Sequence, residues 1–279
     1  MVDVIIFGGQ SNMQGQTEAR PSDKPVADAY EYLAIPDSLE PLTHPVGESV
    51  GCDPAHFAHV YLAQAYKKRG SLVPDFCRSY LRTQKKLEPE AEHKVVAIHT
   101  ALGSTVISDW QKGLPRYDAL VDKARRGIEK AKTLAGTSGD GKIGNIYFVW
   151  LQGESDALAH TTTEDYLSRL YSLKNALKED LGIDAFGIIR VGYFCCLASW
   201  KNNEDYEIRK AYDDAVMKAQ ELAVRRDDDF VMLTRITSSL SLDKRYINPE
   251  ACGHFNNAGM KRIGNCAGAK LAVRKRAGH

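Results

Sequence analysis

The sequence lacks an excess of charge of either sign: lysine and arginine number 37 against 36 for aspartate and glutamate in 279 residues, a formal net charge of +1. A chain without a basic surplus has no global field that would attract nucleic acid or an anionic membrane. It also lacks any apolar run approaching the ~18 residues that a membrane-spanning helix needs. These absences exclude nucleic acid and membrane as expected partners and favour a small-molecule ligand.

The N-terminus lacks the basic segment and the small-residue cleavage site of a secretory signal peptide. We therefore expect a cytoplasmic protein; a secreted one stays open if the native gene encodes a signal ahead of Met1. No linker rich in proline, glycine and serine divides the chain, and 43% of its residues are apolar, enough for one large core. We expect a single domain over residues 1–279.

Cysteine motifs of the redox and zinc-binding types are also missing. The six cysteines include no CxxC pair and no His/Cys cluster at zinc spacing. A chain of this size does not need disulfides to stabilise its core. We expect mostly buried free thiols, no metal and no cofactor.

Five short apolar runs rich in β-branched residues predict strands that are buried on both faces. They are Val2 to Gly8, Lys94 to Thr100, Asn145 to Leu151, Ala185 to Gly192, and Phe230 to Thr234. Helical periodicity predicts helices over Phe57 to Lys68, Asp75 to Lys86, Tyr117 to Leu134, Thr163 to Leu181, Asp205 to Arg225, and Asn257 to Arg276. This alternation predicts an α/β fold in which a parallel sheet of about five strands has helices on both faces.

Ligands of such sheets bind beyond the carboxyl ends of the strands. The loop after the first strand contains Ser11, in the segment GGQSNMQG at residues 8 to 15. Its glycines have the spacing of neither a Walker loop nor a dinucleotide-binding loop. Ser11 is therefore either a helix cap or a nucleophile presented at a strand end.

A late histidine could supply the base that a serine nucleophile needs. His254 lies in the segment GHFNNAG, just before the last predicted helix. A serine hydroxyl is a weak nucleophile at neutral pH, so an imidazole must take its proton during attack and return it to the leaving alcohol. Ester hydrolysis also needs donors for the oxyanion. The backbone N–H groups of Ser11 and Gly103 are candidates, because a glycine lets the backbone approach a substrate closely.

Four blocks, GQSNM, LGS, WLQGES and GHFNNAG, follow one another between residues 8 and 259. Together they resemble the SGNH hydrolases, specifically the carbohydrate-esterase branch that includes acetylxylan esterases and sialic-acid O-acetylesterases. The resemblance implies a three-layer, flavodoxin-like fold and a serine esterase that removes acetyl or other short acyl groups, with an acylated carbohydrate as substrate. It implies Ser11 as nucleophile, His254 as base and the Gln152 amide as third oxyanion donor. The further candidates for substrate binding are Gln10, Asn12, Ser104, Trp110 and Glu154.

Several of these assignments have a structural alternative. Trp110 is either a pocket wall or plain core, and Gln152 could simply satisfy loop backbone. Glu154 is equally well explained as a scaffold that fixes the first and third loops. His99, inside a predicted strand, is expected to be a core residue.

The residue that orients His254 is the least regular part of the pattern. In the family that the chain resembles, an aspartate usually stands three residues before the histidine, where this sequence has Ala251. We predict that Glu250, one residue earlier, takes this role and completes a triad. The alternative is that a backbone carbonyl or a water holds the imidazole and the site is a Ser-His dyad.

Two other functions stay open. The irregular acid position is consistent with a carbohydrate-binding protein that has lost useful catalysis on the same scaffold. A lipid or thioester hydrolase is disfavoured, because the Gln-Gly-Glu block resembles that of the carbohydrate-esterase branch rather than that of the lipase branch.

Overall fold

The chain is described here by a computed structural model that covers residues 1–21, 24–48, 69–138, 142–194 and 206–274. The predicted helix from Phe57 to Lys68 lies outside the described residues. All five predicted strands are present, and the other predicted helices are confirmed with small shifts at their ends.

A seven-stranded sheet forms the middle layer, in the order β3-β2-β4-β1-β5-β6-β7. Its five predicted strands are β1 (Val2–Gly9), β4 (Lys94–His99), β5 (Ile143–Leu151), β6 (Ala185–Ile189) and β7 (Phe230–Thr234), and neighbouring strands among them are parallel. Renumbered along the chain, these five have the 2-1-3-4-5 order of flavodoxin-like folds. The prediction of about five strands was two short, because β2 (Ala29–Leu33) and β3 (Ser38–Pro41) extend one edge.

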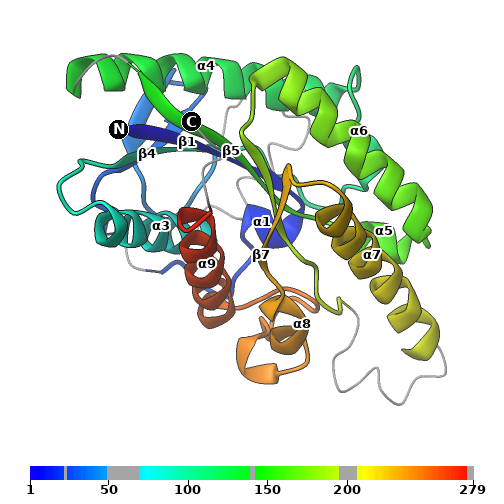
Figure 1. Cartoon of the computed structure of the whole chain (residues 1–279). Helices are drawn as coiled ribbons and strands as arrows, with labels where there is room; N and C mark the ends of the chain where they lie inside the picture. The colour runs from blue at the N-terminus through cyan, green and yellow to red at the C-terminus, as the bar shows by residue number, and fades with distance from the viewer. Residues whose placement is uncertain (22–23, 49–68, 139–141, 195–205, 275–279) are drawn as a thin grey trace.

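Helices cover both faces of the sheet (Figure 1). One face carries α3 (Val73–Leu87) and α9 (Asn257–Ala272), which pack on each other. The other carries α4 (Pro115–Ser138), α6 (Thr163–Leu181) and α7 (Tyr206–Arg226). Shorter elements follow the strand ends: α1 (Ser11–Gln14), η1 (Ile107–Trp110), α5 (Glu154–Leu158), α8 (Ile236–Ser241) and η2 (Lys244–Tyr246). In the described part of the chain, no helix combines the length and the apolar character that a membrane crossing requires.

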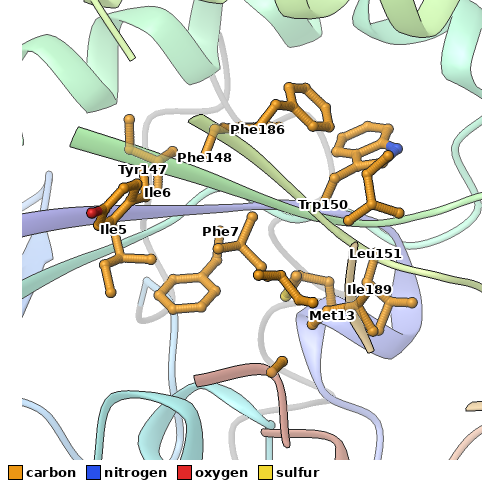
Figure 2. Packing of buried hydrophobic residues seen from close by; sticks show 14 of the residues in the cluster. Ile5, Ile6, Phe7, Met13, Tyr147, Phe148, Trp150, Leu151, Phe186 and Ile189 are labelled. Carbon is orange, nitrogen blue, oxygen red and sulfur yellow. The ribbon is translucent and has the colours of Figure 1, made fainter. Parts of the chain in front are cut away.

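The core lies on both sides of the central strands (Figure 2). Every residue of β1 is buried, and Phe7 contacts Phe76 of α3 edge to face, with ring centroids 5.2 Å apart. On the opposite face, Phe148 stacks on Trp150 with centroids 5.8 Å apart. Burial on both faces explains why these strands read as continuous apolar runs rather than as alternating ones.

The end of β1 lies close against the end of β5. Gly9 has φ +139°, and a Cβ built on it would lie 2.0 Å from the carbonyl oxygen of Leu151, so only glycine fits there. The next residue, Gln10, donates its backbone N–H to the same carbonyl at 3.1 Å. This contact brings the loop that contains Ser11 next to the loop that contains Gln152.

Candidate active site

Ser11 lies where β1 passes into the single turn of α1. The helix begins at Ser11 and its N-cap is Gln10, so the cap interpretation does not explain the serine. N–H groups in the first turn of a helix have no acceptor inside that helix. The Ser11 backbone N–H is therefore free of the helical ladder, next to its own hydroxyl.

Gly103, in the loop after β4, lies directly beside the serine. A Cβ built on Gly103 would lie 3.5 Å from the Ser11 Cβ. The Gly103 backbone N–H donates to Oε1 of Gln14 at 3.0 Å. The donor thus points at an acceptor oxygen supplied by the serine segment, residues 10–16, and the structure brings Ser11 and Gly103 together.

His254 lies in the segment between η2 and α9. Its Nδ1 is 3.0 Å from the backbone carbonyl of Cys252, and its ring meets Phe194 edge to face at 5.6 Å between centroids. A carbonyl can only accept, so Nδ1 carries the proton and Nε2 is left as the acceptor. Burial lowers the pKa of His254, and the nearby Arg69 guanidinium lowers it further. Both effects favour the neutral imidazole that a general base requires.

The structure does not support Glu250 as the group that orients His254. The Glu250 side chain is 62% exposed, and its carboxylate lies 3.8 Å from Arg69. Its backbone N–H donates to Oδ1 of Asn248. Among the described residues, no hydrogen bond joins Glu250 to His254, and none joins Ser11 to His254. The group that contacts His254 Nδ1 is instead the Cys252 carbonyl, and residue types alone gave no signal for this contact.

Gln152 is fully buried and its amide is heavily engaged. Its Nε2 donates to Oε1 of Gln10 at 3.3 Å, to the Thr105 carbonyl at 2.9 Å and to Oδ2 of Asp156 at 2.5 Å. Its Oε1 accepts from the Tyr166 hydroxyl at 3.0 Å. Because these partners use both amide hydrogens, Gln152 ties the three loops together in this conformation and has no donor left for a substrate.

Gln10 and Trp110 are also structural. The Gln10 side chain accepts from the Ser155 backbone N–H at 3.1 Å, at the start of α5. Trp110 is 1% exposed, donates from Nε1 to the Thr105 hydroxyl and packs edge to face on Trp150 at 5.4 Å. The prediction of Trp110 as a pocket wall was therefore wrong, and the core alternative is the one observed.

The remaining candidates divide between surface and interior. Ser104 is exposed, with φ +60°, and directly follows Gly103 in the chain. Asn12 and Glu154 are 1% and 3% exposed, and Nδ2 of Asn12 donates to Oε1 of Glu154 at 2.8 Å. This bond joins the first and third loops, as the scaffold alternative for Glu154 expects. His99 is buried, as predicted, and its Nε2 lies 3.2 Å from the Met13 carbonyl.

Another buried carboxyl, Asp213 of α7, lies near Glu154 and was not anticipated. It is 3% exposed. Burial first, and then the Glu154 charge, raise the pKa of Asp213 to about 7, while the backbone N–H of Phe194 donates to it and lowers the pKa in part. Burial also raises the pKa of Glu154. An aspartate in the middle of a helical pattern normally indicates a solvated face, so no feature of the sequence pattern indicated this pair.

Comparisons with known proteins agree with this architecture. A family model described as "Carbohydrate esterase, sialic acid-specific acetylesterase" matches residues 1–266. A solved protein from Arabidopsis thaliana superposes with a TM-score of 0.64 at 17% identity, over 97% of this chain and 98% of that one. A carbohydrate acetylesterase from Xanthomonas citri gives 0.48 at 15% identity, over 99% and 56% of the two chains. An acetylxylan esterase from Geobacillus stearothermophilus gives 0.43 at 11%, over 99% and 96%. No curated protein sequence matches the chain.

Proposed function

The chain belongs to the carbohydrate esterase family of sialic acid-specific acetylesterases, and from that premise we propose that it is a serine esterase that removes O-acetyl groups from a carbohydrate. Family membership makes it a carboxylic ester hydrolase. The proposal concerns the residues that carry the reaction and the acyl group that is removed.

In the proposed reaction, the Ser11 hydroxyl attacks the acetyl carbonyl and His254 Nε2 takes the hydroxyl proton. The Nδ1–H bond to the Cys252 carbonyl keeps the imidazole in the required tautomer. The C–O bond to the sugar then breaks, and His254 returns the proton to the leaving alcohol. A water molecule, deprotonated by the same imidazole, then attacks the acetyl-serine; the acyl bond to Ser11 breaks, His254 returns the proton to Ser11 Oγ, and acetate is released.

The backbone N–H groups of Ser11 and Gly103 are proposed to hold the oxyanion. The observation that carries this assignment is the Gly103 N–H, which already donates to an oxygen at 3.0 Å beside Ser11. That oxygen belongs to Gln14, so the carbonyl of a bound ester would have to displace the Gln14 side chain. Gln152, with its amide engaged, supports the loops that carry these donors and is not needed as a third donor.

The proposal is tested with a chromogenic acetate ester and with a panel of O-acetylated sugars. We expect the wild type to release acetate, and we expect Ser11→Ala to lose at least about a thousandfold in kcat, since the nucleophile is absent. Thermal unfolding of both proteins is the control, because the fold does not depend on that hydroxyl.

Other outcomes would favour the other functions. Sugar binding without hydrolysis by the wild type would support a carbohydrate-binding protein. A preference for long acyl chains or thioesters would support a lipid or thioester hydrolase. Unchanged turnover in Ser11→Ala would overturn the assignment of the nucleophile.

A further inference from the structure

The side chain next to the proposed nucleophile makes contact with both neighbours of the proposed base. Asn12 donates from Nδ2 to the carbonyl of Gly253 at 3.3 Å, and its Oδ1 accepts from the backbone N–H of Phe255 at 3.2 Å. These two residues flank His254. One buried amide therefore holds the backbone on both sides of the imidazole.

A third partner supports this amide from the opposite direction. Nδ2 of Asn12 also donates to Oε1 of Glu154 at 2.8 Å. A backbone N–H can only donate, so the Phe255 contact fixes which end of the amide is oxygen, and the Glu154 and Gly253 oxygens fix the other end. With three partners from two segments, the amide has a single orientation.

The histidine segment, residues 247–256 between η2 and α9, has little freedom to change its conformation if the Asn12 hydrogen bonds are lost. Gly253 has φ +78°, and a Cβ built on it would lie 2.4 Å from the ring of Phe194. The segment is therefore confined on one side by Phe194 and on the other by Asn12. Since Asn12 directly follows Ser11 in the chain, its contacts couple the position of the serine to the position of the histidine.

We propose that Asn12 is a positioning residue that holds His254 in register with Ser11, an inference that rests on the proposed function. Asn12 does not contact substrate in this account, although the sequence pattern predicted that it would. Its contribution appears in the step in which His254 takes the serine proton. Small displacements of the reacting groups lower kcat and leave substrate affinity nearly unchanged.

The chain offers a matched control in Asn248. This asparagine is also 1% exposed and also joins the histidine segment to the serine segment, with Nδ2 donating to the Gln16 carbonyl at 2.7 Å and Oδ1 accepting from the Glu250 N–H at 2.9 Å. Among the described residues, no hydrogen bond joins its side chain to Gly253 or Phe255. Loss of either amide removes two hydrogen bonds to backbone groups, and only Asn12 bonds to the neighbours of His254, so the two variants separate positioning from general stability.

The experiment compares Asn12→Ala and Asn248→Ala for thermal unfolding, for kcat and KM on a short acetate ester, and for the rate at which a fluorophosphonate labels Ser11. We expect Asn12→Ala to lower kcat and the labelling rate by about thirtyfold or more, with KM within about threefold of wild type. For Asn248→Ala we expect a comparable loss of stability with kcat within about fivefold of wild type. Equal losses of kcat in the two folded variants, or an Asn12→Ala variant with wild-type kcat, would overturn the proposal.

A second variant covers the case in which Asn12→Ala does not fold. Asn12→Ser keeps a hydroxyl, but its side chain is too short to span from Glu154 to both neighbours of His254, and the same loss of kcat is expected. If wild-type protein neither hydrolyses esters nor reacts with the fluorophosphonate, the proposed function fails; if it does both and Asn12→Ser matches it, only the positioning role fails.

Discussion

At the scale of single residues, the site depends on which group holds the Nδ1 proton of His254. An aspartate or glutamate would add charge stabilisation to the imidazolium, whereas the Cys252 carbonyl supplies only a dipole. A dyad held by a carbonyl still fixes the tautomer, which is the part of the orienting role that geometry alone can provide. In the described part of the chain no carboxylate bonds to the imidazole, so we expect His254 to work as a base without one.

Glu250→Gln tests directly whether a carboxylate or the Cys252 carbonyl orients His254. Because the Glu250 carboxylate is 62% exposed and faces Arg69, its charge is screened by solvent and contributes little at the imidazole. We expect kcat/KM near neutral pH to stay within about threefold of wild type. A fall of two orders of magnitude or more would show that Glu250 completes a triad in solution.

Single residues also show how far the sequence could lead. Ser11, Gly103 and His254 were predicted from residue type and from their place after strands or before a helix, and the structure brings Ser11 and Gly103 together. Trp110 and Gln152 were harder, because their roles depend on partners such as Trp150 and Tyr166 that a linear pattern does not reveal.

At the scale of elements, local signals explain the accurate predictions. Helix α6 begins after Thr162, whose hydroxyl accepts from the Asp165 N–H, and it ends at Gly182 in the left-handed region with φ +65°. The hairpin of β2 and β3 was missed because both strands are short and neither contains a run of β-branched residues. Their pairing, such as Glu31 opposite Glu40, and Pro41 at the end of β3 are features of a sheet edge, where the long apolar runs of the central strands are absent.

The contact between α7 and α5 yields a prediction about stability and pH. The pKa of Asp213 on α7 is raised to about 7 from an ordinary value of 3.8, chiefly by burial. Between these values the folded state binds a proton that the unfolded state has released, so the free energy of unfolding should decrease as pH rises from about 4 to 7, by at most about 1.4 kcal/mol per pH unit. Glu154, whose pKa is also raised by burial, contributes in the same direction.

Asp213→Asn removes one of these two titrations. We expect its stability relative to wild type to increase by about 2 kcal/mol between pH 5 and pH 8, as measured by urea denaturation. Asp214→Asn is the control, because Asp214 is only half-buried and pairs with Lys210 at 2.6 Å. An Asp213→Asn variant whose stability relative to wild type does not change with pH would contradict this account of the buried carboxyl.

At the scale of the whole molecule, the sheet gathers functional residues from distant parts of the chain at the carboxyl ends of its strands. Ser11 follows β1, Gly103 follows β4 and Gln152 follows β5, so the parallel topology delivers all three to the same end of the sheet. The histidine segment comes from far along the chain and is joined to the serine segment by Asn12, across more than 240 residues of sequence. The sheet could be predicted from apolar runs, whereas this contact could not, because hydrogen bonds between irregular segments leave no periodic signal.

The central claim, that Ser11 is a nucleophile activated by His254, is tested most directly by covalent labelling. Wild-type protein, Ser11→Ala and His254→Ala are treated with a fluorophosphonate, and the adduct is followed by intact mass and by peptide mapping. We predict one adduct per chain, on Ser11, no adduct on Ser11→Ala, and labelling at least about a hundredfold slower on His254→Ala, because general-base assistance is lost. An adduct on another residue, or an unchanged labelling rate in His254→Ala, would contradict the account.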